Sequence, residues 1–270
     1  GAFAAELRPL QPHGCGGRHQ RGNQYAGMMA AVSKCRIAGA SEPWTTGLVV
    51  TGHASVECQA KIPQSADPDA LTYVWTIIES PAGSNAEPTT QARTTEVWFD
   101  QLGRYRLELL PIVTASGAAC ASSEVRVVHQ TNSDLLVELR WTTPNDPVAD
   151  EGFGAGADVD LHLLHSNGCW EDPRWDVHFR NNNPNWGDAR RRDDDPSMDI
   201  DDTNSAGLEV IRLSNVEPTT YDVGVHYWDE HGFGTSVAVV RIYAYGELVY
   251  EQEQVLETTG TFWHAASVTF

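Results

Sequence analysis

Acidic side chains recur at short intervals in two stretches of the C-terminal half of this 270-residue chain. Residues 158–162 read DVDLH, and residues 199–209 read DIDDTNSAGLE. Side chains two residues apart on a strand share one face and lie about 7 Å apart, which places Asp158 beside Asp160. Carboxylates crowded in this way repel one another unless a hard cation neutralises them. The two stretches therefore predict a cation site.

Calcium is the cation that these side chains favour. It takes about six to eight oxygen ligands, which several carboxylates and an amide can supply. The site is not an EF-hand, because the D-x-D-x-D-G register and the flanking helices are missing. The alternative is a solvated acidic turn that needs no ion. The predicted ligands are Asp158, Asp160, Asp199, Asp201, Asp202, Asn204 and Glu209.

Histidines raise a second kind of chemistry, that of a metal-dependent hydrolase. His162 shares a strand face with Asp158 and Asp160, where it could bind a transition metal. The chain contains no H-E-x-x-H motif and no G-x-S-x-G motif. A histidine that forms hydrogen bonds on the strand face is the simpler interpretation, and we expect no enzymatic activity.

Two of the nine tryptophans lie in segments that we expect to be loops. Exposed indole rings stack on sugar rings, so Trp170 and Trp186, with His162, are candidates for a ligand site in a carbohydrate-binding module. Tryptophans that anchor loops or fill a core are the alternative. The polar segment 181–207 is long for a loop in a compact domain, and such loops usually carry function or need an ion.

The formal charge of −19 is concentrated in one half of the chain. Residues 1–130 carry 11 acidic and 10 basic side chains, whereas residues 131–270 carry 26 and 8. This asymmetry predicts a domain boundary near residue 130. The negative field repels phosphate backbones, so we expect no nucleic-acid partner. No apolar run reaches the roughly 18 residues that a transmembrane helix needs, so we expect no transmembrane segment.

The five cysteines form no C-x-x-C motif of a zinc or redox site. In an all-β extracellular protein they suggest one or two disulfides with one cysteine left over. The first pairing that we consider is Cys58 with Cys120, and the second is Cys15 with Cys35. The sequence does not determine this connectivity. Gly-Cys-Gly-Gly at 14–17 leaves a lipoprotein anchor open, although no apolar run precedes it.

Short segments rich in Val, Ile, Tyr and Trp follow one another from Leu48 onward, and turn-forming clusters separate them. Convincing helical periodicity is absent. The pattern predicts an all-β protein of two β-sandwich domains. We expect a partly irregular lead-in segment at 1–44, an immunoglobulin-like sandwich at 45–130, and a larger acidic antiparallel sandwich with a long acidic loop at 131–270.

The N-terminal sandwich carries an ordered set of motifs. Residues 65–84 read SADPDALTYVWTIIESPAGS, and residues 97–110 read VWFDQLGRYRLELL. A D-P-D turn, a Y-x-W strand, a P-x-G-S loop and a D-x-x-G-x-Y segment occur here in the order typical of polycystic-kidney-disease (PKD) domains, which residues 45–130 resemble. Trp75 is expected to fill the core between two sheets. The resemblance implies a spacer or adhesive module without catalysis.

The C-terminal half resembles another family. ADVDLHLL at 157–164, NPNWGD at 183–188 and TGTFWHAASV at 259–268 are similar to the C-terminal β-sandwich of exported myxobacterial surface proteins. Those domains are in turn similar to the YfaP-like domain with its D-V-D-L-H-V motif. The chain departs from the family where G-P-E is common, because residues 207–209 read GLE. The resemblance implies export and a surface location, and it names no activity.

These observations predict a non-catalytic, exported cell-surface protein for adhesion or recognition, whose C-terminal sandwich binds calcium and is stabilised by it. Its partner would be an unidentified protein or glycan at a cell surface. A carbohydrate-binding module that uses loop tryptophans is the alternative function. A metal-dependent hydrolase is the third.

Overall fold

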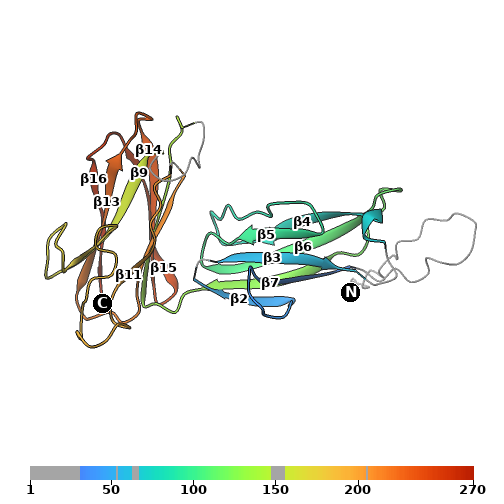
Figure 1. The fold of residues 1–270 in the computed structure, drawn as a ribbon, viewed down its shortest axis with the longest axis horizontal. Coiled ribbons are helices and arrows are strands. Elements are labelled where there is room, and N and C mark those ends of the chain that lie inside the picture. The colour runs from blue at the N-terminus through green and yellow to red at the C-terminus, as the bar shows by residue number, and fades with distance from the viewer. Residues whose placement is uncertain (1–30, 53, 63–66, 147–155, 205) are drawn as a thin grey trace, which may run out of the picture. The chain divides into compact units, whose positions relative to one another are not determined.

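The computed structural model describes residues 31–52, 54–62, 67–146, 156–204 and 206–270. Apart from one 3-10 turn, η1 (Pro68–Ala70), strands form all the regular structure in these ranges, and the predicted all-β class is confirmed. The chain divides into two compact units, one ending at Gln130 and the other beginning at Thr131 (Figure 1). Within the described ranges, no helix has the length and apolar character needed to cross a membrane.

The first unit is a seven-stranded sandwich of the immunoglobulin type. One sheet has the order β1-β3-β5 and the other β2-β7-β6-β4, in which β2 runs parallel to β7. Both sheets contribute side chains to one hydrophobic core. The strands are β1 (Val32–Ile37), β2 (Gly47–Thr51), β3 (Ser55–Lys61), β4 (Leu71–Glu79), β5 (Thr94–Trp98), β6 (Gly103–Val113) and β7 (Ser123–Gln130).

Two aromatic side chains hold the sheets of the first unit together. Trp75 on β4 is buried in the core, and its indole N–H donates a hydrogen bond to the Ala92 carbonyl at 2.8 Å. The Tyr105 hydroxyl donates to the Gln101 carbonyl at 2.9 Å and accepts from the Gln101 N–H at 3.0 Å. A tyrosine bonded back to the preceding turn is the tyrosine corner of immunoglobulin-type sandwiches.

The predicted disulfide between Cys58 and Cys120 is wrong, because Cys58 is bonded to Cys35. Strand β1 is the antiparallel neighbour of β3, and Cys35 lies directly opposite Cys58 in their register. This bond also excludes the pairing of Cys35 with Cys15, which lies outside the described residues. Cys120 is disulfide-bonded as well, whereas Cys169 carries a free thiol. Strand β1 falls within the segment that the sequence predicted as the lead-in.

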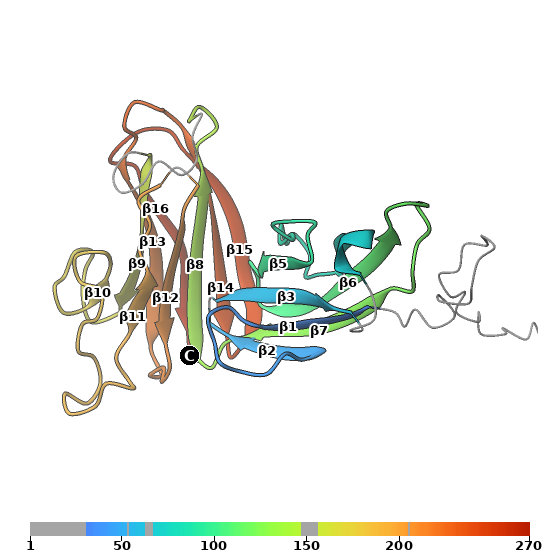
Figure 2. The same cartoon turned by 45° about the vertical axis from the view of Figure 1, so that its right-hand side comes forward.

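The second unit is a nine-stranded sandwich. Its sheets have the orders β10-β9-β13-β16 and β11-β12-β8-β14-β15, and all neighbours in them are antiparallel (Figure 2). The strands are β8 (Leu135–Thr142), β9 (Asp158–His165), β10 (Asp176–Val177), β11 (Ser197–Ile200), β12 (Leu208–Leu213), β13 (Thr220–Asp229), β14 (Ser236–Ala244), β15 (Glu247–Leu256) and β16 (Phe262–Thr269).

Strand β9 is buried on both of its faces. Val159, Leu161 and Leu163 belong to the core between the sheets, yet Asp160 and His162 on the opposite face are buried too. On the edge facing away from β13, the two-residue strand β10 pairs with Leu163 and Leu164. The N-terminal half of β9 therefore needs another partner for its backbone.

Candidate metal centre

Three carboxylates from separate parts of the second sandwich converge at this edge of β9. Asp160 comes from β9, Glu209 from β12 in the facing sheet, and Asp201 from the segment between β11 and β12. One oxygen of each lies within 4.8 Å of the oxygens of the other two. Carboxylate oxygens gathered so closely are the ligand set that a hard cation prefers.

Glu209 enters the cluster because it completes the open edge of β9. Its Oε2 accepts a hydrogen bond from the Leu161 N–H at 2.6 Å, so a side chain takes the place of a neighbouring strand. The Glu209 side chain is 0% exposed, and within the described structure its Oε1 has no hydrogen-bond partner. The backbone contact thus holds one oxygen, and the second oxygen is left for another ligand.

Asp160 is the second buried member of the cluster. It is 2% exposed, and its Oδ2 has no hydrogen-bond partner among the described residues. Burial raises the pKa of Asp160 to about 8, and the charges of Asp158 and Asp201 add to that rise. Burial also raises the pKa of Glu209 well above its ordinary value, with Asp160 as the next cause. A divalent cation would remove this penalty by neutralising the carboxylates.

Three more of the predicted ligands, Asp158, Asp202 and Asn204, belong to strand β9 or to the segment between β11 and β12. Burial raises the pKa of Asp158 to about 6, and Asp201 is the largest charge acting on it. Asp202 accepts the N–H groups of Asn204 at 3.2 Å and Leu208 at 3.4 Å, which shapes the turn before β12. The buried Oδ1 atom of Asn204 has no partner within the described structure. The charges of Asp201 and Asp202 act on Asp158, and Asn204 contacts Asp202 through its backbone N–H.

Close packing fixes the end of this turn. Gly207 lies against the ring of Trp141, where an added Cβ would come within 2.0 Å of Cζ2. The Gly207 carbonyl accepts the Trp141 N–H at 3.2 Å. The chain must therefore pass close to β8 two residues before Glu209, and only glycine permits this approach.

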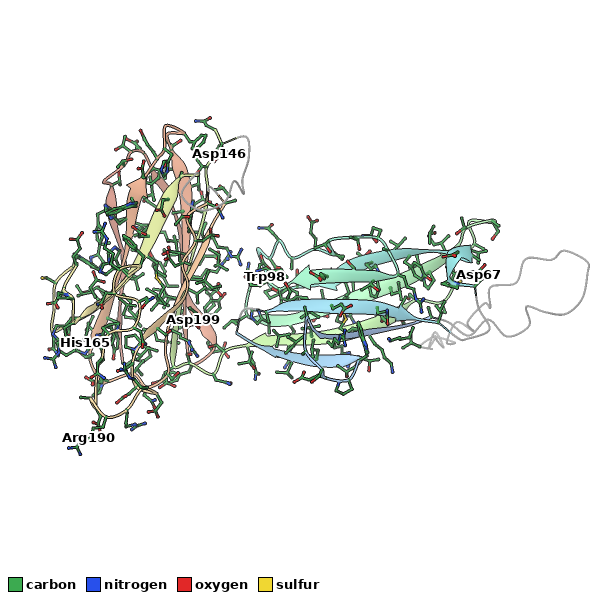
Figure 3. All side chains as sticks on the ribbon, in the orientation of Figure 1. Asp67, Trp98, Asp146, His165, Arg190 and Asp199 are labelled. Atoms are coloured by element: carbon green, nitrogen blue, oxygen red, sulfur yellow. A yellow bond between two sulfur atoms is a disulfide. The ribbon has the colours of Figure 1, made fainter. Side chains whose placement is uncertain are left out.

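Asp199 is the predicted ligand that the structure leaves out of the three-carboxylate group. Its side chain forms an ion pair with Arg212 at 2.7 Å and accepts the Ser197 hydroxyl at 2.9 Å (Asp199 is labelled in Figure 3). The expectation that Asp199 and Asp201 act together assumed a regular strand. The β11–β12 register shifts between Met198 and Ile200, and β11 ends there, so the alternation is interrupted.

His162 forms a side-chain contact on the outer face of β9. Its Nδ1 lies 2.9 Å from Oδ2 of Asp176, which is fully buried, and its ring stacks on that of His178 at 4.9 Å. The acidic residue that orients His162 is therefore on β10 and not on β9. Sequence reasoning missed Asp176 because nothing in the local pattern shows that a two-residue strand will pair beside β9.

The two candidate tryptophans have unlike environments. Trp186 is 3% exposed, donates its indole N–H to the Arg174 carbonyl at 2.7 Å and stacks on Tyr221. It anchors its loop and presents no free ring face. Trp170 is only half-buried, and its ring contacts that of Phe262 at 4.9 Å between centroids. Of the two, Trp170 alone is placed where a ligand could reach it.

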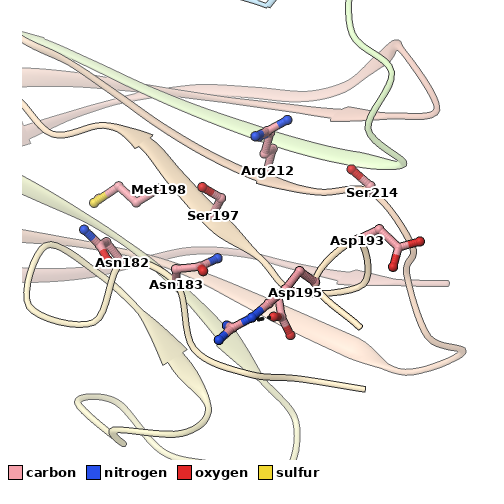
Figure 4. A pocket seen from close by; sticks show the side chains of 9 residues that line it. Asn182, Asn183, Asp193, Asp195, Ser197, Met198, Arg212 and Ser214 are labelled. Atoms are coloured by element: carbon pink, nitrogen blue, oxygen red, sulfur yellow. Dashed lines mark hydrogen bonds and ion pairs between the residues drawn. The ribbon is translucent and has the colours of Figure 1, made fainter. Parts of the chain in front are cut away.

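A polar pocket of about 600 Å³ lies beside β11 and β12 (Figure 4). Arg192 and Arg212 line it, together with Asn183. Arg192 is paired with Asp195 at 3.3 Å and Arg212 with Asp199. Because both guanidinium groups are already neutralised, the pocket lacks the free positive charge of an anion site, and we assign it no function.

No protein-family model matches the chain, and no curated protein matches its sequence. Among solved structures, the Escherichia coli adhesin FdeC is 13% identical, over 87% of this chain and 66% of that chain, with a TM-score of 0.22. The C-terminal domain of the Streptococcus agalactiae AgI/II polypeptide BspA is 7% identical, over 84% and 100%, with a TM-score of 0.25.

A quinonprotein alcohol dehydrogenase-like protein from Bacteroides thetaiotaomicron is 11% identical, over 84% of this chain and 63% of that chain, with a TM-score of 0.23. The chain therefore spans only 66% and 63% of the lengths of the Escherichia coli and Bacteroides proteins. Likenesses this distant do not bear on activity or partners.

Proposed function

We propose that the chain is a non-catalytic recognition or adhesion protein of the cell exterior, and that Ca²⁺ stabilises its C-terminal sandwich. One observation carries the calcium part of this proposal. Asp160 and Glu209 are two buried carboxylates, each with an unpartnered oxygen, and they lie beside Asp201. Burying such charges without a partner is costly, so a bound cation supplies what the protein alone does not.

The donor set supports calcium over smaller or softer ions. All three converging groups are carboxylates, and the further donors that we propose are Asp158, Asp202 and the amide of Asn204 in the same two segments. Hard oxygen donors in this number suit Ca²⁺, whereas Mg²⁺ keeps several of its waters and Zn²⁺ prefers nitrogen and sulfur. The proposed ion would join β9 to the turn before β12, and so connect the two sheets at one edge.

A role in binding suits the position of these groups better than a role in catalysis. Asp160 and Glu209 are buried at a strand edge, where a substrate cannot reach them. The Cys35–Cys58 disulfide supports a location outside the reducing cytoplasm. Extracellular calcium modules bind their ion with dissociation constants of about 0.1–1 mM. The PKD-like and YfaP-like resemblances of the two sandwiches are part of the same proposal.

The test is a thermal melt of the full chain after metal removal, with added Ca²⁺, Mg²⁺ or Zn²⁺. At a Ca²⁺ concentration about 100 times its Kd, we expect Tm of the second sandwich to rise by roughly 5–10 °C. Asp201→Asn should abolish most of this rise. Asp199→Asn is the matched control, since it makes the same change two residues away on a side chain bound to Arg212.

Two results would contradict the proposal. One is a melting temperature that does not respond to Ca²⁺. The other is an equal loss of the response in Asp199→Asn and Asp201→Asn, which would show a general effect of acidic charge and no specific site. A larger stabilisation by Zn²⁺ than by Ca²⁺ would overturn the choice of ion.

A further inference from the structure

Aromatic rings form a continuous strip on the outer face of the sheet β10-β9-β13-β16. His226 and Trp228 are two residues apart on β13, and Phe262 on β16 pairs with His226 in the strand register. Neighbouring rings have centroids 4.9 to 6.1 Å apart. The aromatic strip consists, in spatial order, of His264, Trp170, Phe262, His226, Trp228 and Phe179.

The strip lies on the face away from the core, except for Phe179 at its end, which packs against the core. The alternate residues of β13, Val223, Val225 and Tyr227, are buried between the two sheets. His226 and Trp228 therefore point outward, and both are only half-buried. Phe262 is 39% exposed, and His264 is exposed too. Rings that only filled a core would not retain this much contact with solvent.

A glycine lets two of the rings lie close to the sheet. Gly224 pairs with His264 across the β13–β16 ladder and has no side chain to lift the rings away. A Cβ there would come within 2.6 Å of Cζ of Phe262 and 3.0 Å of the Trp170 ring. The bulge between Val223 and Gly224 adjusts the register at this point. The local backbone thus lets both rings lie close to the sheet, where their planes are tilted by 57° to one another.

Polar groups border the strip at both ends. At one end, Nε2 of His264 and the Ser267 hydroxyl both contact Oδ1 of Asp222. At the other end, the Arg180 guanidinium lies 4.5 Å from the centre of the Trp228 ring. Ligand sites commonly combine aromatic walls with a few fixed polar groups. Hydrogen-bonding groups at the ends and imidazoles within the strip suit a ligand with both apolar faces and hydroxyls.

We propose that the aromatic strip binds a neutral oligosaccharide. The C–H faces of sugar rings match the exposed ring faces, and the hydroxyls match His226, His264 and Asp222. The charge of −18 in residues 131–270 opposes acidic polysaccharides and nucleic acids. This inference names the ligand class of the recognition function proposed above and rests on that proposal.

The experiment uses the full chain, in millimolar Ca²⁺, on an array of neutral oligosaccharides built from glucose, mannose, galactose or N-acetylglucosamine. Sialylated and sulfated oligosaccharides are included for contrast. We expect binding to at least one neutral series, together with a change in tryptophan fluorescence on titration with the soluble oligosaccharide. Trp170→Ala and Phe262→Ala should each weaken binding about tenfold, as the loss of one stacked ring predicts.

Two further variants separate the strip from general effects of folding. Tyr245→Asn removes a ring that is 66% exposed and lies outside the strip, and it should leave binding unchanged. Gly224→Ala keeps every ring but displaces Phe262 and Trp170, so it should weaken binding as well. The thermal unfolding transition of the second sandwich, measured on each variant, shows whether this unit is still folded.

Each remaining outcome has a distinct meaning. If no neutral oligosaccharide binds while Ca²⁺ still raises Tm, the inference is wrong and the calcium proposal stands. Binding to acidic glycans alone would also overturn it. So would binding that survives both Trp170→Ala and Phe262→Ala in folded protein. If glycans bind and Tm does not respond to Ca²⁺, the calcium part of the proposed function is wrong and the strip is supported.

Discussion

Both sandwiches bury a carboxylate at the margin of their cores, but the hydrogen-bond partners of this carboxylate differ between them. In the first sandwich, Asp100 accepts hydrogen bonds from the Asn85 N–H at 2.7 Å and from the Ser84 hydroxyl, and the Tyr105 hydroxyl, which donates to the Gln101 carbonyl, lies 3.3 Å away. In the second, Glu209 accepts one backbone N–H, and its other oxygen has no partner in the described part of the chain. The same chemical group is internally satisfied in one unit and open to a ligand in the other.

The difference shows how a structural carboxylate is told apart from a ligand-binding one. Sequence composition does not separate them, because each is one acidic residue in a strand-rich segment. The number of donors that reach the carboxylate does separate them. Four predictions test this distinction, beginning with the one that should change stability most.

Replacing Asp100 with Ala should destabilise the first sandwich by about 3 kcal/mol or more. The change leaves the Asn85 N–H and the Ser84 hydroxyl without their acceptor, and each unsatisfied buried donor costs about 1–3 kcal/mol. The loss should be the same with and without Ca²⁺, as measured by urea unfolding in both conditions. A calcium-dependent loss would mean that Asp100 is not a purely internal partner.

Replacing Glu209 with Gln should have opposite effects in the two conditions. The amide oxygen still accepts the Leu161 N–H, so the edge of β9 stays closed. With Ca²⁺ at about 100 times its Kd, the variant should lose the roughly 2.7 kcal/mol that ion binding contributes. Without metal it should be more stable than the wild type, since a buried charge is gone. Glu253→Gln on the exposed strand β15 is the control, and it should behave as wild type.

The metal-free protein should lose stability as the pH rises. The pKa of Asp160 is raised to about 8 in the folded protein, against an ordinary value of about 4 in the unfolded chain. The folded state therefore binds the extra proton between these values, and stability falls from about pH 4 to pH 8. Melting curves at pH 5 and pH 8 measure this slope. Asp160→Asn should flatten the slope of stability against pH. An unchanged slope in that variant would show that other groups cause the pH dependence.

The smallest effect should come from Tyr105→Phe, which removes the hydroxyl of the tyrosine corner and keeps the ring. We expect a loss of about 1–2 kcal/mol, because the Gln101 N–H and the Gln101 carbonyl each lose one hydrogen bond while the core packing remains. Chemical unfolding of the full chain measures it. A loss as large as that of Asp100→Ala would show that the hydroxyl, and not the carboxylate, organises this network.

Local patterns were sufficient for the strands and for part of the site. Alternating apolar residues predicted β4, β6, β9 and β13, and the D-x-D spacing pointed to Asp160, which the structure places beside Asp201 and Glu209. The same spacing failed for Asp199, because a register shift interrupts the alternation. Trp186 was a candidate because its segment is polar, yet its ring packs on Tyr221 beneath the loop.

The sequence by itself determined the class of structure and pointed to acidic side chains as the candidate site, because both depend on spacing along a strand and on the types of side chain. Only the tertiary structure decided which groups meet. Strand pairing places Cys35 opposite Cys58 and Phe262 beside His226. The packing of the two sheets brings the Glu209 side chain to the Leu161 N–H. Such contacts arise from the packing of segments distant in sequence, which no local pattern encodes.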